Sequence, residues 1–209
     1  MNDGRRLGRR CVLRDSVTAE DVMDYAENSG WLPIGHIAAD PAQGVHFELL
    51  WSVGPEVTAH YVEDGFAHVR YVTATGSDLV RIEATAARIE RQLQAWTVDE
   101  LSGQLDRAEL AQDRAAAVVR LGMAAPLTAI PAVIDRLKAA TRDSDHSVRH
   151  AAVWAMIYTA WPRFRPVLAG LVDDPALDVA GVSAAALRAL DDEDFDETAG
   201  ARQSPGVGL

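Results

Sequence analysis

The chain has 209 residues, of which 48% are hydrophobic and 24% charged, with a net charge of −11. These values are typical of a soluble globular protein that is long enough to bury its own core. Its apolar runs stay short of the ~18 residues that a membrane span needs. A single cysteine, Cys11, excludes a disulfide framework and a cysteine-rich zinc site.

The charge is unevenly distributed along the chain. Residues 1–14 carry +4, residues 15–98 carry −9, residues 99–190 carry −1 and residues 191–209 carry −5. We therefore expect a flexible basic arm over 1–15 and a disordered acidic, Gly- and Pro-containing tail over 194–209. Because most of the surface would repel phosphates, we expect a protein partner rather than nucleic acid.

The arginines at the start of the chain are not followed by an apolar segment, so we expect no secretory signal and a cytoplasmic protein. Lys138 is the only lysine among 20 basic residues, and alanine is abundant. This composition suggests a GC-rich bacterial genome.

An α+β module is predicted over 16–98. Thr18 to Asp21 is a helix start, with a threonine cap and acids in the first turn, and Gly30 ends that helix. Residues 36–44 are expected to form a loop. Residues 45–53 alternate as a strand: Val45, Phe47, Leu49, Trp51 and Val53 share one face, and His46, Glu48, Leu50 and Ser52 share the other.

Two more strands are expected at 57–62 and 66–73. Asp64-Gly65 between them predicts a hairpin with a two-residue turn, in which Tyr61 pairs with His68. A helix with a buried stripe from Leu79 to Leu93 then follows Asp78. The module is thus expected to be a helix, a three-stranded antiparallel meander and a second helix.

From the capping box at Thr97–Glu100 onward, only helical patterns occur, and we expect an all-α region over 99–193. The segment 130–137 matches 161–168 at an offset of 31, with Pro131 aligned to Pro162 and Leu137 to Leu168. Paired helices that recur at such a period indicate stacked helical hairpins.

The segment 143–152, DSDHSVRHAA, is close to the D-x-D-x-x-V-R-x-A-A pattern of HEAT-like repeats. Over about 107–191 the chain resembles HEAT-like repeat proteins, which implies a short solenoid and a binding role. The next copy keeps Asp174 and Val179 but has Ala180 in place of the arginine. We expect Arg149 to bond an acid or carbonyl in the adjacent turn.

Signals for chemistry are weak. His146 and His150 have a zinc-compatible i,i+4 spacing, but no acidic base lies between them, so no metal or cofactor is predicted. His60 and His68 are expected on opposite faces of the hairpin. Cys11 has arginine neighbours but no histidine beside it, so no nucleophilic role is predicted.

Aromatic and arginine residues gather near the second repeat. We take these residues as a candidate binding site, with packing between repeats as the alternative reading of the rings. The candidates are Tyr158, Trp161, Arg163, Phe164 and Arg165.

Three functions remain open at this point. The first is a non-catalytic protein-binding module or regulator, for example an immunity or antitoxin protein, since an acidic chain suits a basic partner. The second is a DNA glycosylase like some HEAT-like proteins, with Arg149, Trp154, Trp161 and Arg163 in its groove. The third is a small-ligand-binding α+β module with its site in the loop 36–44. We favour the first.

Overall fold

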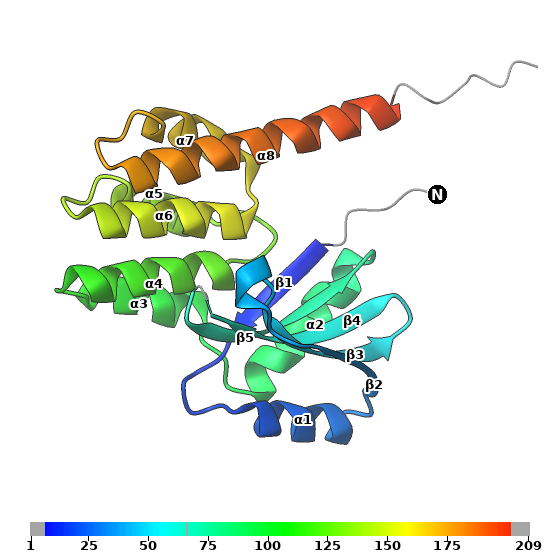
Figure 1. Cartoon of the computed structure of the whole chain (residues 1–209). Helices are drawn as coiled ribbons and strands as arrows, with labels where there is room; N and C mark the ends of the chain where they lie inside the picture. Colours follow the sequence, from blue (N-terminus) through cyan, green and yellow to red (C-terminus); the bar gives the residue numbers. More distant parts are fainter. Residues whose placement is uncertain (1–6, 66, 202–209) are drawn as a thin grey trace, which may run out of the picture.

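The computed structural model describes residues 7–65 and 67–201 and has a mixed α and β fold (Figure 1). A five-stranded antiparallel sheet has the order β1-β5-β4-β3-β2. The strands are β1 (Leu7–Val12), β2 (Leu32–Ile37), β3 (Phe47–Gly54), β4 (Val57–Asp64) and β5 (Val69–Gly76). The predicted meander forms the centre of the sheet, but the expected count of three strands is wrong because β1 and β2 add one strand at each edge.

Strand β1 comes from the segment that we expected to be a flexible arm. Arg9 points toward helix α2 (Leu79–Gln92), where its guanidinium donates to Glu83 at 2.8 Å and to Glu90 at 2.6 Å. Cys11 is buried on the same face of the sheet. The flexible-arm prediction is therefore wrong for residues 7–12, and residues 1–6 lie outside the described part of the chain.

The connection between β4 and β5 is longer than the predicted two-residue turn. Asp64 pairs with Val69, so Tyr61 lies opposite Val72 and not opposite His68. The Asp64 carboxylate accepts a hydrogen bond from the Ala67 amide at 2.8 Å. His68 has a positive φ of 51° and lies in the turn. The aspartate thus organises a longer turn, and the predicted register is corrected by several residues.

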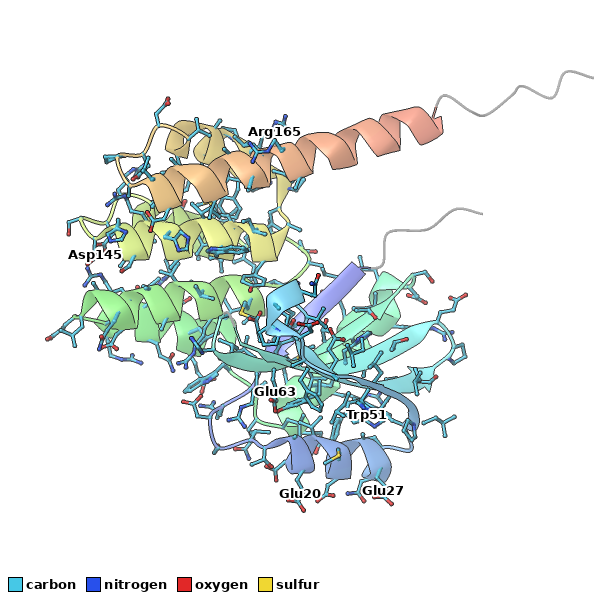
Figure 2. All side chains as sticks on the ribbon, viewed as in Figure 1. Glu20, Glu27, Trp51, Glu63, Asp145 and Arg165 are labelled. Carbon is cyan, nitrogen blue, oxygen red and sulfur yellow. The ribbon has the colours of Figure 1, made fainter. Side chains whose placement is uncertain are left out.

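Helices α1 (Ala19–Asn28) and α2 cover one face of the sheet. The predicted caps are present: Thr18 and Asp21 form a capping box, and the Asp78 side chain accepts from the first amides of α2. Trp51 is buried on this face, and Figure 2 shows it between the sheet and α1. Trp51, which the sequence places on the apolar face of its strand, is thus part of the core.

The remaining helices pack in pairs. Helices α4, α6 and α8 form one row, while α3, α5 and α7 each lie against the next helix in the chain (Figure 1). Their bounds are α3 (Val98–Arg107), α4 (Ala111–Ala124), α5 (Pro131–Ala140), α6 (His146–Thr159), α7 (Arg165–Leu171) and α8 (Leu177–Ala201). Two 3₁₀ turns complete the fold: η1 (Pro41–Gln43) and η2 (Pro162–Phe164).

Residues 105–190 contain no strand, as predicted. Helix α8 continues to Ala201, so the tail predicted to be disordered from residue 194 is helical up to that point. Residues 202–209 lie outside the described part of the chain.

Equivalent arginine–aspartate pairs join successive helical pairs. Arg114 of α4 donates to both oxygens of Asp143, at 2.8 and 3.0 Å. Arg149 of α6 makes the same two bonds to Asp174, at 2.8 and 2.9 Å, and also donates to the carbonyl of Asp143. The expected bonding of Arg149 is confirmed. The assignment to HEAT-like repeats itself stays a prediction.

The sheet and the helical rows share a hydrophobic core. Val12, Val62 and Tyr71, from the sheet face opposite α2, belong to the same buried cluster as Val118 and Leu121 of α4. Helix α4 therefore covers one end of this second face. The rest of this face of the sheet is not covered by α4 and is available for a binding site.

Candidate functional site

The structure divides the five predicted site residues among three environments. Trp161 and Phe164 are buried and stack on each other, with ring centroids 5.8 Å apart and an angle of 15° between their planes. The Trp161 indole N–H donates to the Pro126 carbonyl at 3.1 Å. Both rings are thus used largely in packing, which is the alternative that the sequence left open.

Arg163 and Arg165 are exposed on the outermost helical layer. Figure 2 shows Arg165 at the end of the molecule opposite to Glu20 and Glu27 of α1. The predicted cluster is therefore not one continuous surface.

Tyr158, which lines one hollow of the surface together with Trp161, bonds directly to the sheet. Its hydroxyl donates to the buried Asp64 carboxylate at 3.0 Å, and its carbonyl accepts from Arg10 at 3.1 Å. Burial and the nearby Asp64 charge raise the pKa of Tyr158 well above its usual value. The phenol therefore stays protonated and acts as a fixed hydrogen-bond donor that ties α6 to β4.

A cleft of about 670 Å³ lies between the uncovered face of the sheet and the ends of α4 and α6. Its floor consists of alternate residues on β1, β5, β4 and β3, which share one face because the side-chain period of a strand is two. The polar floor residues are Arg10, Glu48, His60, Thr73 and Thr75. The rest of the lining combines the apolar residues Leu79, Leu127, Ile157 and Pro162 with the polar residues Thr128, Tyr158 and Thr159.

Three floor residues form a hydrogen-bonded row across adjacent strands. His60 Nδ1 lies 3.0 Å from a Glu48 carboxylate oxygen, and its Nε2 lies 3.2 Å from the Thr75 hydroxyl. The Thr75 hydroxyl also lies 3.4 Å from the carbonyl of Thr58. Each polar group of the row is therefore held in place by a neighbouring strand.

A hydroxyl, an imidazole and a carboxylate in this order resemble the groups that activate the nucleophile of a hydrolase. However, the Thr58 carbonyl competes with His60 for the Thr75 proton. Moreover, β-branched Thr75 belongs to a regular strand, paired with Thr58 and Gly8. The row is therefore better suited to positioning a ligand than to attacking one.

A second candidate surface is the outer edge of the sheet at β2. All six residues of β2 are exposed. Leu32, Ile34 and Ile37 keep 69, 60 and 41% of their surface accessible. Exposed apolar residues are unremarkable when scattered, but here they are adjacent on one strand. This edge is continuous with the β3 strand that contributes Glu48 to the cleft floor.

The β2 edge belongs to a segment without positive charge. Residues 15–69 contain ten acidic residues and no lysine or arginine. Trp31, directly before β2, packs against Tyr25 of α1 with ring centroids 5.1 Å apart. Figure 2 shows Glu20 and Glu27 of that helix on its side away from the sheet, where they add to the negative charge of this part of the chain.

The sequence missed most of this arrangement. The alternation of His46, Glu48, Leu50 and Ser52 on one strand face was the available signal, and it placed Glu48 on what became the cleft floor. The loop predicted over 36–44 is part strand, since β2 extends to Ile37. Residues of that loop line a separate hollow beside His46 and His68.

The two histidines with zinc-like spacing have other partners. His146 Nδ1 lies 3.1 Å from Asp178, and the Trp154 indole N–H donates to His150 at 3.3 Å. Among residues 7–65 and 67–201, no group of three or more His, Cys, Asp or Glu side chains is placed to hold a metal ion.

Comparison with protein-family models, with curated proteins and with solved structures found no match. In the described part of the chain, no helix combines the length and the hydropathy that crossing a bilayer would require. The functional argument therefore depends on the two surfaces just described.

Proposed function

We propose that this chain is a protein-binding module whose partner docks on the exposed β2 edge of the sheet. The observation that carries the proposal is the exposed apolar row of Leu32, Ile34 and Ile37 on an edge strand that no other described element covers. Protein edge strands are usually short, charged or covered, because open apolar edges invite association. An edge of this kind is favourable only where a partner buries it.

The docking mode follows from the backbone of β2. Pro33 has no N–H to donate, and the pairing with β3 is interrupted by a bulge between Pro33 and Gly35. A partner strand would therefore find few backbone groups in register. We infer that the partner contacts the side chains of β2 rather than extending the sheet.

The partner's chemistry follows from the charge around this edge. An apolar edge in a segment that has ten acids and no lysine or arginine between Arg14 and Arg70 suits a protein with an apolar contact and a basic rim. An immunity or antitoxin protein that binds a basic toxin is one specific form of this proposal.

The DNA glycosylase alternative is less consistent with the structure. The residues proposed for its groove do not converge: Arg149 is bonded to Asp174, Trp161 is buried and Trp154 donates to His150. A nucleic-acid groove needs cations that remain available to phosphates.

The proposal is tested by comparing three forms of the full-length protein as affinity baits in a bacterial lysate. In the first variant, Leu32, Ile34 and Ile37 are each changed to Ser. The matched control changes Leu110 and Leu177 to Ser, since they are exposed by 59 and 88% on the helical part of the chain. All replaced side chains are at the surface, so the melting temperatures of the three forms should agree within a few degrees.

We expect a basic protein that the wild type and the control capture equally and that the β2 variant loses. Its capture should weaken between 50 and 300 mM salt, because the charged rim is screened at a Debye length of about 10 Å or less. A set of captured proteins that is the same for all three forms would remove the β2 edge as the binding surface.

A further inference from the structure

Arg10 on the cleft floor differs from most of the other partly buried arginines and resembles Arg70, which also donates to a carbonyl, that of Asp15. Arg9, Arg114 and Arg149 each bond one or two carboxylates at 2.6–3.0 Å. Arg10 instead donates to the Tyr158 carbonyl, and no carboxylate of the described residues forms an ion pair with it. Among the described residues, no Arg10 nitrogen is both buried and without a partner, so its remaining N–H donors are accessible to an anion that enters the cleft.

The Arg10 side chain is held in position before any ligand arrives. Its guanidinium lies 5.2 Å from the centroid of the Tyr158 ring and 5.8 Å from that of Tyr71. Contacts of this kind attract a cation to the ring face and fix the planar group. A guanidinium has five N–H donors, of which one bonds the Tyr158 carbonyl and another interacts with the Tyr71 hydroxyl. The cation is thus oriented while donors remain for a ligand.

The surroundings of Arg10 limit the charge of that ligand. Glu48, on the same floor, and Asp64, beneath Tyr158, are both acidic, and the chain as a whole carries −11. A multiply charged anion would be repelled by this field, whereas one negative charge is matched by one guanidinium. Thr73 is the cross-strand neighbour of Arg10 and adds a hydroxyl beside it.

The shape of the cleft adds an apolar requirement. Leu127 and Ile157 line the cleft beside the helices and Leu79 lines it at the start of α2, and the volume of about 670 Å³ is in the range of small-molecule sites. Gly8 leaves space in the cleft next to Arg10 that a side chain would occupy. A Cβ at this position would lie 3.1 Å from the Thr75 methyl carbon and 3.2 Å from the Thr73 hydroxyl.

We propose that this cleft binds a small organic monocarboxylate, with the carboxylate on Arg10 and its apolar portion against Leu127 and Ile157. Planar guanidinium groups match carboxylates in a two-bond geometry. This site is separate from the β2 edge, so it does not depend on the protein-binding role proposed above.

The test measures binding of octanoate to the full-length protein by titration calorimetry and by amide chemical shifts. 1-Octanol has the same chain without the charge, octyl phosphate carries more charge, and hexanoate shortens the chain. We expect octanoate to bind at least tenfold more tightly than octanol or octyl phosphate. Each methylene removed should weaken binding by up to about fourfold, because burial of one CH₂ group changes the affinity by that factor. The shifted amides should include Thr73, Thr75 and Ile157.

Two variants distinguish the contribution of the Arg10 charge to binding from that of the cleft volume. Arg10→Met keeps a long side chain but removes the cation, and it should weaken octanoate binding about tenfold or more, with little effect on octanol. Arg88→Met, at an exposed position on α2, is the matched control and should bind like the wild type. Gly8→Val reduces the volume of the cleft and leaves Arg10 in place, so it should weaken the binding of both octanoate and octanol. This variant still tests the site if Arg10→Met does not fold.

Several results would overturn the proposal. No measurable binding of octanoate at millimolar concentration would remove the site. Equal affinity for octanol, or tighter binding of octyl phosphate, would exclude the monocarboxylate class. Shifts centred on Leu32–Ile37 would place the ligand on the β2 edge, in which case the protein-binding proposal could still stand.

Discussion

Replacing Arg149 by alanine should destabilise the helical part of the chain more than any replacement of an exposed arginine. The Arg149 guanidinium makes two bonds to Asp174 and also donates to the carbonyls of Asp143 and Ser144, at 3.0 and 3.2 Å. It therefore joins the turn before its own helix to the turn before the next one. The side chains of Arg149 and Asp174 are only 13 and 6% exposed, so solvent replaces little of what is lost.

The magnitude follows from what remains after the change. Hydrogen bonds to charged groups contribute about 1.5–3 kcal/mol each when a buried partner is left unsatisfied. Asp174 keeps one bond, from the Ala176 amide at 2.9 Å, and water can reach part of the carboxylate once the arginine is removed. We therefore expect a loss of about 2 kcal/mol in the free energy of unfolding, or roughly 4–8 °C in Tm for a chain of this length.

Thermal melts and denaturant titrations of Arg149→Ala and Arg88→Ala measure the difference, since Arg88 is exposed on α2. A double-mutant cycle with Asp174→Ala should give a coupling of about 1–2 kcal/mol. Arg149→Lys should recover less than half of the loss, because an ammonium cannot make the two parallel bonds. If Arg149→Ala melts like Arg88→Ala, the reasoning from these contacts is refuted.

Three further predictions follow from the structure. Gly122→Ala should lower the free energy of unfolding by several kcal/mol, because the new methyl group would lie 2.5 Å from the Ala155 Cα. Gly170→Ala, where the new methyl group meets no neighbouring atom, should leave the stability unchanged or raise it. Cys11 is buried and burial raises its thiol pKa, so a thiol reagent at pH 8 should modify it only on unfolding. Hydrogen bonds from arginine lower the pKa of Asp143 and Asp174. The stability that these carboxylates add to the fold is complete above the unfolded-state pKa of about 4 and is lost as the pH falls below it. Tm should therefore fall more steeply in acid for the wild type than for Arg149→Ala.

Local signals predicted the elements whose stabilising contacts lie within a few residues. The capping boxes at Thr18 and Thr97, the Asp78 cap and the proline at the start of α5 all appear where the sequence places them. In each case a side chain satisfies an amide of the same helix end, or a proline occupies a position where no amide is needed. Contacts of this kind can be read directly from sequence spacing.

Contacts between distant segments could not be read in this way. Strand β1 contains one glycine and two arginines among its six residues. It becomes a strand by pairing with β5, 59 to 69 positions further along the chain, and its two arginines are used on opposite faces of the sheet. The β4–β5 turn was mispredicted because Asp64-Gly65 fits a two-residue turn locally, while the buried Asp64 is fixed by Tyr158. Long-range burial decided both outcomes.

The same reasoning explains why the cleft exists at all. Arg10 and Tyr158 are 148 positions apart, and they meet because α4 packs on β1 and carries α6 over the sheet. Val12 and Tyr71 are shared between the sheet and the helical core, so the two halves cannot separate without exposing that cluster to water. The cleft floor and the rest of its lining therefore keep a fixed spacing, which a preformed ligand site requires. Sequence identifies the residue types on each wall, but only the shared core determines that the two walls face each other.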